Sequence, residues 1–146
     1  MDEIRVKKIL LVVESSEESM KAARWAIHLA SVCDAMLVCL NVVDTVVVNQ
    51  LRKFSGKDFS TVEVEVEEQG WKYLYYLEDA AKDRKVHCVI MQESGILSEE
   101  VVKKSEEVNA DLVVMGRRTG SSMKRVVHGP IQRILEHAPC PVLVVT

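Results

Sequence analysis

The sequence lacks a hydrophobic run long enough to cross a membrane. Its apolar stretches are only a few residues long, whereas a transmembrane helix needs roughly 20 consecutive apolar residues. The first three residues, Met1, Asp2 and Glu3, also lack the basic start of a secretory signal peptide. We therefore predict a cytoplasmic protein with no membrane partner.

Several motifs of enzymes and metal sites are missing as well. The chain has neither a Gly-x-Ser-x-Gly elbow nor a Walker-type phosphate loop, so nothing independent indicates acyl or phosphoryl transfer. Its histidines share no metal-ligand spacing, which predicts no metal site. No Cys-x-x-Cys pair occurs, and the cysteines lie in or beside apolar runs, which favours buried, reduced thiols: Cys33, Cys39, Cys88 and Cys140. An enzyme is therefore the less favoured interpretation.

What is present is an ordinary globular composition with one unusual charged segment. The 146 residues, 48% hydrophobic and 28% charged, predict a single domain over residues 1–146 with its own core. A net charge of −3 gives no reason to expect a nucleic-acid partner. Residues 116–135 nevertheless contain no Asp or Glu, which predicts a local anion site; the cations there are Arg117, Arg118, Lys124, Arg125 and Arg133.

Short apolar runs alternate with helical patterns along the chain. Ser15-Ser16-Glu17-Glu18 contains an S-x-x-E capping box that predicts a helix start, and Ser60 with Glu63 predicts a second. The mixed segment from Asp44 to Asp58 has no clear period and is predicted to be a loop. We expect further helices over 97–108 and 130–137, and strands over 8–13, 35–43, 86–91, 111–115 and 142–145.

This alternation predicts a doubly wound α/β domain, with a five-stranded parallel sheet and helices on both faces. In such sheets ligands bind beyond the carboxyl ends of the strands, at the point where the strand order reverses. Two segments with unusual chemistry follow predicted strands: Glu14-Ser15-Ser16 after the first, and residues 116–129 after the fourth. We expect the ligand to lie between them.

The segment Met115-Gly-Arg-Arg-Thr-Gly120, followed later by Gly129, resembles the nucleotide loop of the universal stress proteins. That loop reads G-x-x-G, nine residues, then G followed by Ser or Thr. The resemblance covers the whole chain, from KILLVV through DLVVMG to HAPCPVLVV. It implies a role in stress response, a homodimer paired through the last strand, and in some members ATP binding.

The resemblance also implies which residues would contact ATP or AMP, with Mg²⁺ bound only if the ligand is ATP. Glycines permit a close approach of the backbone to a phosphate, and helix-start amides carry partial positive charge. The implied nucleotide-binding residues are Val13, Glu14, Ser15, Met115, Gly116, Arg117, Arg118, Thr119, Gly120, Gly129, Pro130 and Ile131.

Three of these residues depart from the family pattern. Thr119 stands where the second glycine is expected, and its branched Cβ resists positive φ. Pro130 replaces the Ser or Thr and has neither hydroxyl nor N–H, and Glu14 replaces an aspartate. The neighbouring cations and the hydroxyls of Ser121 and Ser122 could replace the lost donors, or the basic segment could simply be a solvated loop.

Three functions remain open at this point. The favoured one is a module that binds a nucleotide or another phosphate-bearing small molecule and acts through conformation or partners. The second is a dimeric interaction protein that binds no nucleotide. The third is a weak Mg²⁺-dependent phosphohydrolase, with Glu14 as a metal ligand and Arg117 or Lys124 stabilising transferred charge.

Overall fold

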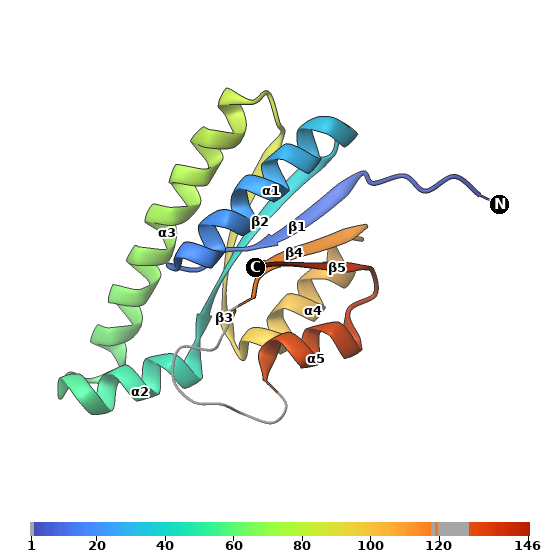
Figure 1. Ribbon diagram of the computed structural model, residues 1–146. Coiled ribbons are helices and arrows are strands. Elements are labelled where there is room, and N and C mark those ends of the chain that lie inside the picture. The colour runs from blue at the N-terminus through green and yellow to red at the C-terminus, as the bar shows by residue number, and fades with distance from the viewer. Residues whose placement is uncertain (1, 118, 120–128) are drawn as a thin grey trace.

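The protein, described by a computed structural model over residues 2–117, 119 and 129–146, is a five-stranded parallel sheet covered by helices (Figure 1). The strand order is β3-β2-β1-β4-β5, and every neighbouring pair is parallel. The predicted fold is therefore confirmed. In chain order the elements are β1 (Lys8–Val12), α1 (Glu17–Cys33), β2 (Met36–Asp44), α2 (Thr45–Ser55), α3 (Phe59–Asp83), β3 (Cys88–Gly95), α4 (Leu97–Glu107), β4 (Leu112–Gly116), α5 (Pro130–His137) and β5 (Val142–Val145).

The sheet has a hydrophobic core on each of its two faces. Ile9 and Leu11 of β1 point into a cluster with α1 and α3, whereas Leu10 and Val12 point into a second cluster with α4 and α5. Because successive side chains of a strand alternate between faces, a strand buried on both sides must be apolar at every position. This explains the uninterrupted KILLVV run. No helix in the described part of the chain is long and apolar enough to span a membrane.

The segment predicted to be a loop contains a helix, so that prediction is wrong. Asp44 begins α2 by accepting a hydrogen bond from the Val46 amide (3.0 Å), and Gly56 ends it with φ of 71°. Val48 is the one residue of α2 that is fully buried, where it packs on Val43 and Val62. The segment has an apolar period, since Val48, Leu51 and Phe54 are three residues apart, but the helix is short and its other residues mix apolar and polar types.

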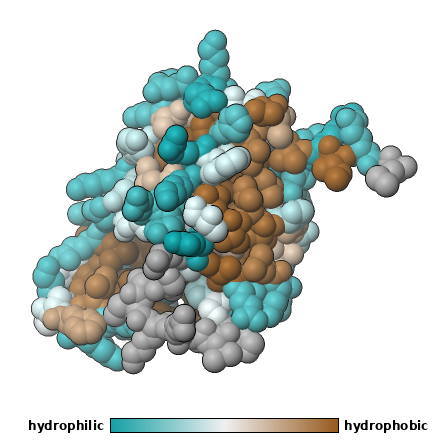
Figure 2. Space-filling model, in the orientation of Figure 1, coloured by the Kyte–Doolittle hydropathy of each residue, from teal (hydrophilic) through white to brown (hydrophobic). Residues whose placement is uncertain are grey.

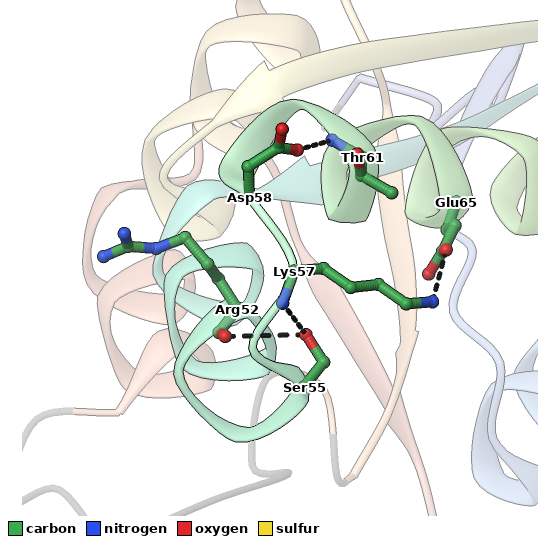
Figure 3. Close-up of polar contacts among 6 residues, drawn as sticks. All are labelled: Arg52, Ser55, Lys57, Asp58, Thr61 and Glu65. Atoms are coloured by element: carbon green, nitrogen blue, oxygen red, sulfur yellow. Dashed lines mark hydrogen bonds and ion pairs between the residues drawn. The ribbon is translucent and has the colours of Figure 1, made fainter.

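The next helix, α3, starts two residues earlier than the predicted cap implies. Its cap is Asp58, whose Oδ1 accepts from the Thr61 amide at 2.8 Å, rather than Ser60 (Figure 3). Lys57 before it pairs with Glu65, Nζ to Oε1, at 2.7 Å. The α1 cap is likewise Ser16 rather than Ser15, with Ser16 Oγ accepting from the Ser19 amide at 3.0 Å. Both helices were predicted, and only their caps are shifted.

The four cysteines are free thiols at different depths. Cys39 is fully buried and Cys88 and Cys140 are partly buried, broadly as predicted. Cys33 is exposed in the last turn of α1, so the prediction of burial is wrong there. Cys33 follows Ala30, which is the last buried residue of α1.

Candidate functional site

The candidate site lies at the carboxyl edge of the sheet, between β1 and β4. The strand order reverses here, because the chain passes from β1 to β2 on one side and later returns to add β4 on the other. The two strands are in register from Ile9↔Leu112 to Leu11↔Val114, so their carboxyl ends lie next to each other. The structure therefore brings together the starts of the two segments that the sequence singled out, at the place where ligands bind in such sheets.

On the β1 side the backbone is tightly held. Val13 is buried, donates its amide to the Leu40 carbonyl (2.8 Å) and accepts from Asn41 Nδ2 at its own carbonyl (3.0 Å). The Glu14 amide donates to Ser19 Oγ at 2.8 Å, which ties the strand end to the first turn of α1. Glu14 itself is half-buried and Ser15 is exposed. These hydrogen bonds hold in place the main chain of Val13 and Glu14, which would meet a ligand.

A buried polar network supports this strand end, and sequence reasoning missed it. Gln92 Nε2 donates both to Asn41 Oδ1 (3.1 Å) and to the carbonyl of Glu67 in α3 (2.9 Å). Gly70 of α3 lies against the same amides, and a Cβ there would overlap Asn41 Oδ1. The signal in the sequence was Asn41 itself, a polar residue inside an otherwise apolar strand. The network links β1, β2, β3 and α3 directly beneath Val13.

On the β4 side, Gly116 is needed for packing. Its φ is not in the left-handed region, and an added Cβ would lie 2.8 Å from the carbonyl carbon and 2.9 Å from the oxygen of Glu18. Contacts that close to a backbone cannot be relieved by a side-chain movement. The sequence analysis attributed this glycine to the approach of a phosphate, and the structure gives it a second reason, the approach of α1.

The turn after β4 closes on itself without the second glycine of the family pattern. The Thr119 amide (3.1 Å) and its Oγ1 (2.8 Å) both donate to the Gly116 carbonyl, and Thr119 is 4% exposed. Its φ is not positive, so the branched side chain causes no strain there. The Arg117 amide donates to the Val145 carbonyl of β5 (2.9 Å). Both amides are therefore already used within the protein.

The amino end of α5 offers further main-chain donors. Gly129 is its cap residue, with φ of −69° and no side-chain acceptor, and Pro130 occupies the first helical position. The missing N–H of Pro130 matters little to the helix, because that amide has no intrahelical partner in any case. The amides of Ile131 and Gln132 follow in the same uncapped first turn, where the helix carries partial positive charge.

Other predicted features of the site fall outside the described residues: Arg118, Gly120, Ser121, Ser122, Lys124 and Arg125. Arg117 is described and exposed. Asp44 ends β2 at the same edge of the sheet, and burial raises its pKa although the amides of Val46 and Val47 act against this. Within the described part of the chain, no group of three or more His, Cys, Asp or Glu side chains could hold a metal ion.

Comparisons with known proteins agree with this architecture. The model of the universal stress protein family matches residues 5–146. A universal stress protein of Methanocaldococcus jannaschii is 30% identical over 146 residues, which cover 95% of this chain and 81% of the relative. A universal stress protein solved in complex with cAMP has a TM-score of 0.70 at 18% identity, covering 97% of this chain and 98% of that chain. A universal stress protein of Archaeoglobus fulgidus, solved in complex with dAMP, has a TM-score of 0.66 at 15% identity over 99% of this chain and all of its own. The chain belongs to the universal stress protein family.

Proposed function

We propose that this protein binds an adenine nucleotide or a similar phosphate-bearing molecule at the carboxyl edge between β1 and β4, and acts in stress response through conformation or partners. The observation that carries the proposal is the uncapped first turn of α5, which begins at the edge where the strand order reverses. Such a turn attracts an anion because its amides lack internal acceptors and point toward the ligand. Solved relatives in complex with cAMP and with dAMP support a nucleotide as the ligand.

The two sides of the site would contact different parts of the ligand. The phosphate would accept hydrogen bonds from the Ile131 and Gln132 amides and from the exposed Arg117 side chain. Val13, Glu14 and Ser15 would contact the rest of the ligand on a backbone that Asn41 and Ser19 hold in place. If ATP is the ligand, Mg²⁺ would be bound mainly by its phosphates, with the Glu14 carboxylate as a further oxygen ligand.

Isothermal titration calorimetry with AMP, ATP and inorganic phosphate tests this proposal. We expect Arg117→Ala to weaken binding about tenfold, the equivalent of about 1.4 kcal/mol, through loss of a charged hydrogen bond. Arg24→Ala, on the exposed side of α1, is the matched control and should leave the affinity unchanged. Pro130→Ser should tighten binding because it restores an amide and a hydroxyl at the helix start. Equal affinities in all four proteins would reject this site.

We further propose that two copies pair through β5. This strand is at the edge of the sheet and consists only of apolar residues, of which Val142, Leu143 and Val144 are partly exposed. An apolar area also covers the part of the surface where β5 lies in Figure 1 (Figure 2). An exposed apolar edge strand readily pairs with another strand, and a second copy of itself would satisfy its open backbone groups.

Hydrogen bonds within the sheet identify the residue to change. Pro141 and Val145 direct their carbonyls toward β4, where they accept from the Val113 and Arg117 amides. Because backbone groups alternate along a strand, the N–H of Val144 points to the open edge. Val144→Pro should therefore shift the protein from dimer to monomer in light scattering, whereas Val144→Ala, which keeps the N–H, should remain a dimer. A wild-type protein that is monomeric at high concentration would contradict the pairing.

One observation favours the second function, a dimeric interaction protein that binds no nucleotide. The Arg117 and Thr119 amides already have partners, so the turn after β4 offers fewer donors than the family motif would. In that case calorimetry would record no heat with any of the three ligands, while the dimer would persist. The two functions are therefore separated by the same titration.

A further inference from the structure

Two thiols meet inside the sheet, on strands β2 and β3. Cys39 lies in β2 and Cys88 is the first residue of the neighbouring strand β3. Their Sγ atoms are 3.7 Å apart, although the residues are 49 positions apart in the chain. Both side chains belong to the core face that α1 and α3 cover. A contact between two cysteines that are so distant in sequence is a property of the fold alone.

The two thiols differ in their access to solvent. Cys39 is 0% exposed, whereas Cys88 is partly exposed at the start of an edge strand. The other two cysteines provide an internal comparison, because Cys33 is exposed and Cys140 is partly buried, and neither contacts another thiol. The pair therefore combines a partly exposed cysteine with a fully buried one whose thiol is in contact with it.

We propose that Cys39 and Cys88 are a site of reversible oxidation by hydroperoxides, in which Cys88 reacts first and Cys39 closes a disulfide. The sulfur of Cys88 attacks the terminal oxygen of the hydroperoxide, the O–O bond breaks, and an alcohol or water leaves. Cys88 is then a sulfenic acid. The sulfur of Cys39 attacks the Cys88 sulfur, the S–O bond breaks, and the hydroxyl leaves as water with the Cys39 proton. The two thiols lose two electrons and two protons in total, and the hydroperoxide is reduced.

The electrostatics of the pair agree with this order of events. The hydrogen bond from the Cys39 thiol lowers the pKa of Cys88, although burial acts in the opposite direction. The same contact and burial raise the pKa of Cys39. Since the thiolate is the reactive form, the first step belongs to Cys88, the residue that is also the more exposed.

The sheet register explains why the bond would be easy to reverse. Cys39 lies opposite Ile90 and Cys88 lies opposite Leu37, so the cysteines are offset along their strands. A disulfide needs its sulfurs at about 2.05 Å, and it forms here only if the first residues of β3 shift toward β2. Disulfides that displace the backbone in this way are the more readily reduced ones, and they serve as switches rather than as structural links. The inference does not depend on the ligand proposed above.

Peptide mass spectrometry after oxidation tests the proposal on the full chain. The reduced protein would be treated with hydrogen peroxide, its remaining thiols alkylated under denaturing conditions, and the peptides compared before and after reduction. We expect a Cys39–Cys88 linked peptide that disappears on reduction, with Cys88 consumed about tenfold faster than Cys140, which is partly buried but has no neighbouring thiol. The proposal is wrong if Cys88 is consumed no faster than Cys140, or if the linked peptide contains Cys33 in place of Cys39 or Cys88.

Two variants separate the roles of the cysteines. Cys39→Ala should leave Cys88 as a sulfenic acid that a dimedone reagent traps, because no second thiol is present to close the bond. Cys88→Ser should leave Cys39 unoxidised, because it is buried. Trapping of the sulfenic acid in the wild type to the same extent as in Cys39→Ala would contradict the pairing. The wild-type measurement decides the question even if a substitution of the buried Cys39 prevents folding.

Discussion

The two sides of the candidate site are built in different ways. On the β1 side, a buried network of Asn41 and Gln92 holds the Val13 carbonyl in place from beneath. On the β4 side, the Arg117 and Thr119 amides donate to the Val145 and Gly116 carbonyls. The first turn of α5, among the described residues of this side, has no side-chain cap. In the proposed function, the β1 side would orient a ligand, and α5 rather than the Arg117 and Thr119 amides would bind its charge.

The largest effect is expected from Gly116→Ala, which tests the packing on the β4 side. Its Cβ would meet the backbone of Glu18 at 2.8 Å, so α1 must move away from β4. We expect a loss of about 3 kcal/mol in the free energy of unfolding of the ligand-free protein, measured in urea. Gly56→Ala is the control: no atom lies within 4 Å, and only its φ of 71° causes strain, which costs about 1 kcal/mol. If Gly116→Ala were as stable as the wild type but no longer bound ligand, Gly116 would be needed for ligand binding rather than for packing.

The β1 side is tested by a pair of substitutions in the polar network. Gly70→Ala should cost about 2 kcal/mol because its methyl group overlaps the Asn41 amide. Asn41→Ala should cost about 2 kcal/mol because it removes the hydrogen bond to the Val13 carbonyl and one of the two hydrogen bonds that Gln92 Nε2 donates. The double variant should lose less than the sum, since the added methyl then has room. Asn49→Ala, exposed on α2, should stay within about 0.5 kcal/mol of wild type. Strict additivity would show that Gly70 and Asn41 do not interact.

A smaller, pH-dependent effect on stability is expected at Asp44, the last residue of β2, which is the neighbour of β1. Burial raises its pKa above the ordinary value of 3.8, so the folded state holds the proton more tightly than the unfolded state. Stability from this group is present at low pH and is lost as the pH rises through the folded pKa. Asp44→Asn should keep the α2 cap, because Asn also caps helices, and should remove this loss of stability at higher pH. The difference in the free energy of unfolding should be below about 1 kcal/mol because Asp44 is partly solvated. Parallel stability curves for both proteins between pH 3 and 7 would contradict it.

The fold could be predicted from the sequence because each buried strand is a short apolar run that only a doubly covered sheet accommodates. The caps were displaced by one residue in α1 and by two in α3, because Ser15 and Ser16, or Asp58 and Ser60, are all capable of capping a helix. Helix α2 was missed although Val48, Leu51 and Phe54 recur at helical spacing, because the segment is short and buries Val48 alone.

The candidate site was only partly predictable. The segments after β1 and β4 were identified because they follow strands in an α/β pattern, and the structure places the carboxyl ends of these two strands side by side. The network of Asn41, Gln92 and Gly70 was missed because its members are far apart in the chain and only the sheet brings them together. The second role of Gly116 depends on the path of α1, which no local pattern contains.

The most direct test of the central claim is to follow the backbone amides by NMR while AMP is added. We predict that the Ile131 and Gln132 amides shift most, together with Glu14, because these groups would meet the phosphate and the rest of the ligand. The Arg117 and Thr119 amides, which already have acceptors, should move less. Saturating AMP that leaves Ile131 and Gln132 unchanged, or that shifts Thr119 most, would contradict the claim that α5 binds the charge.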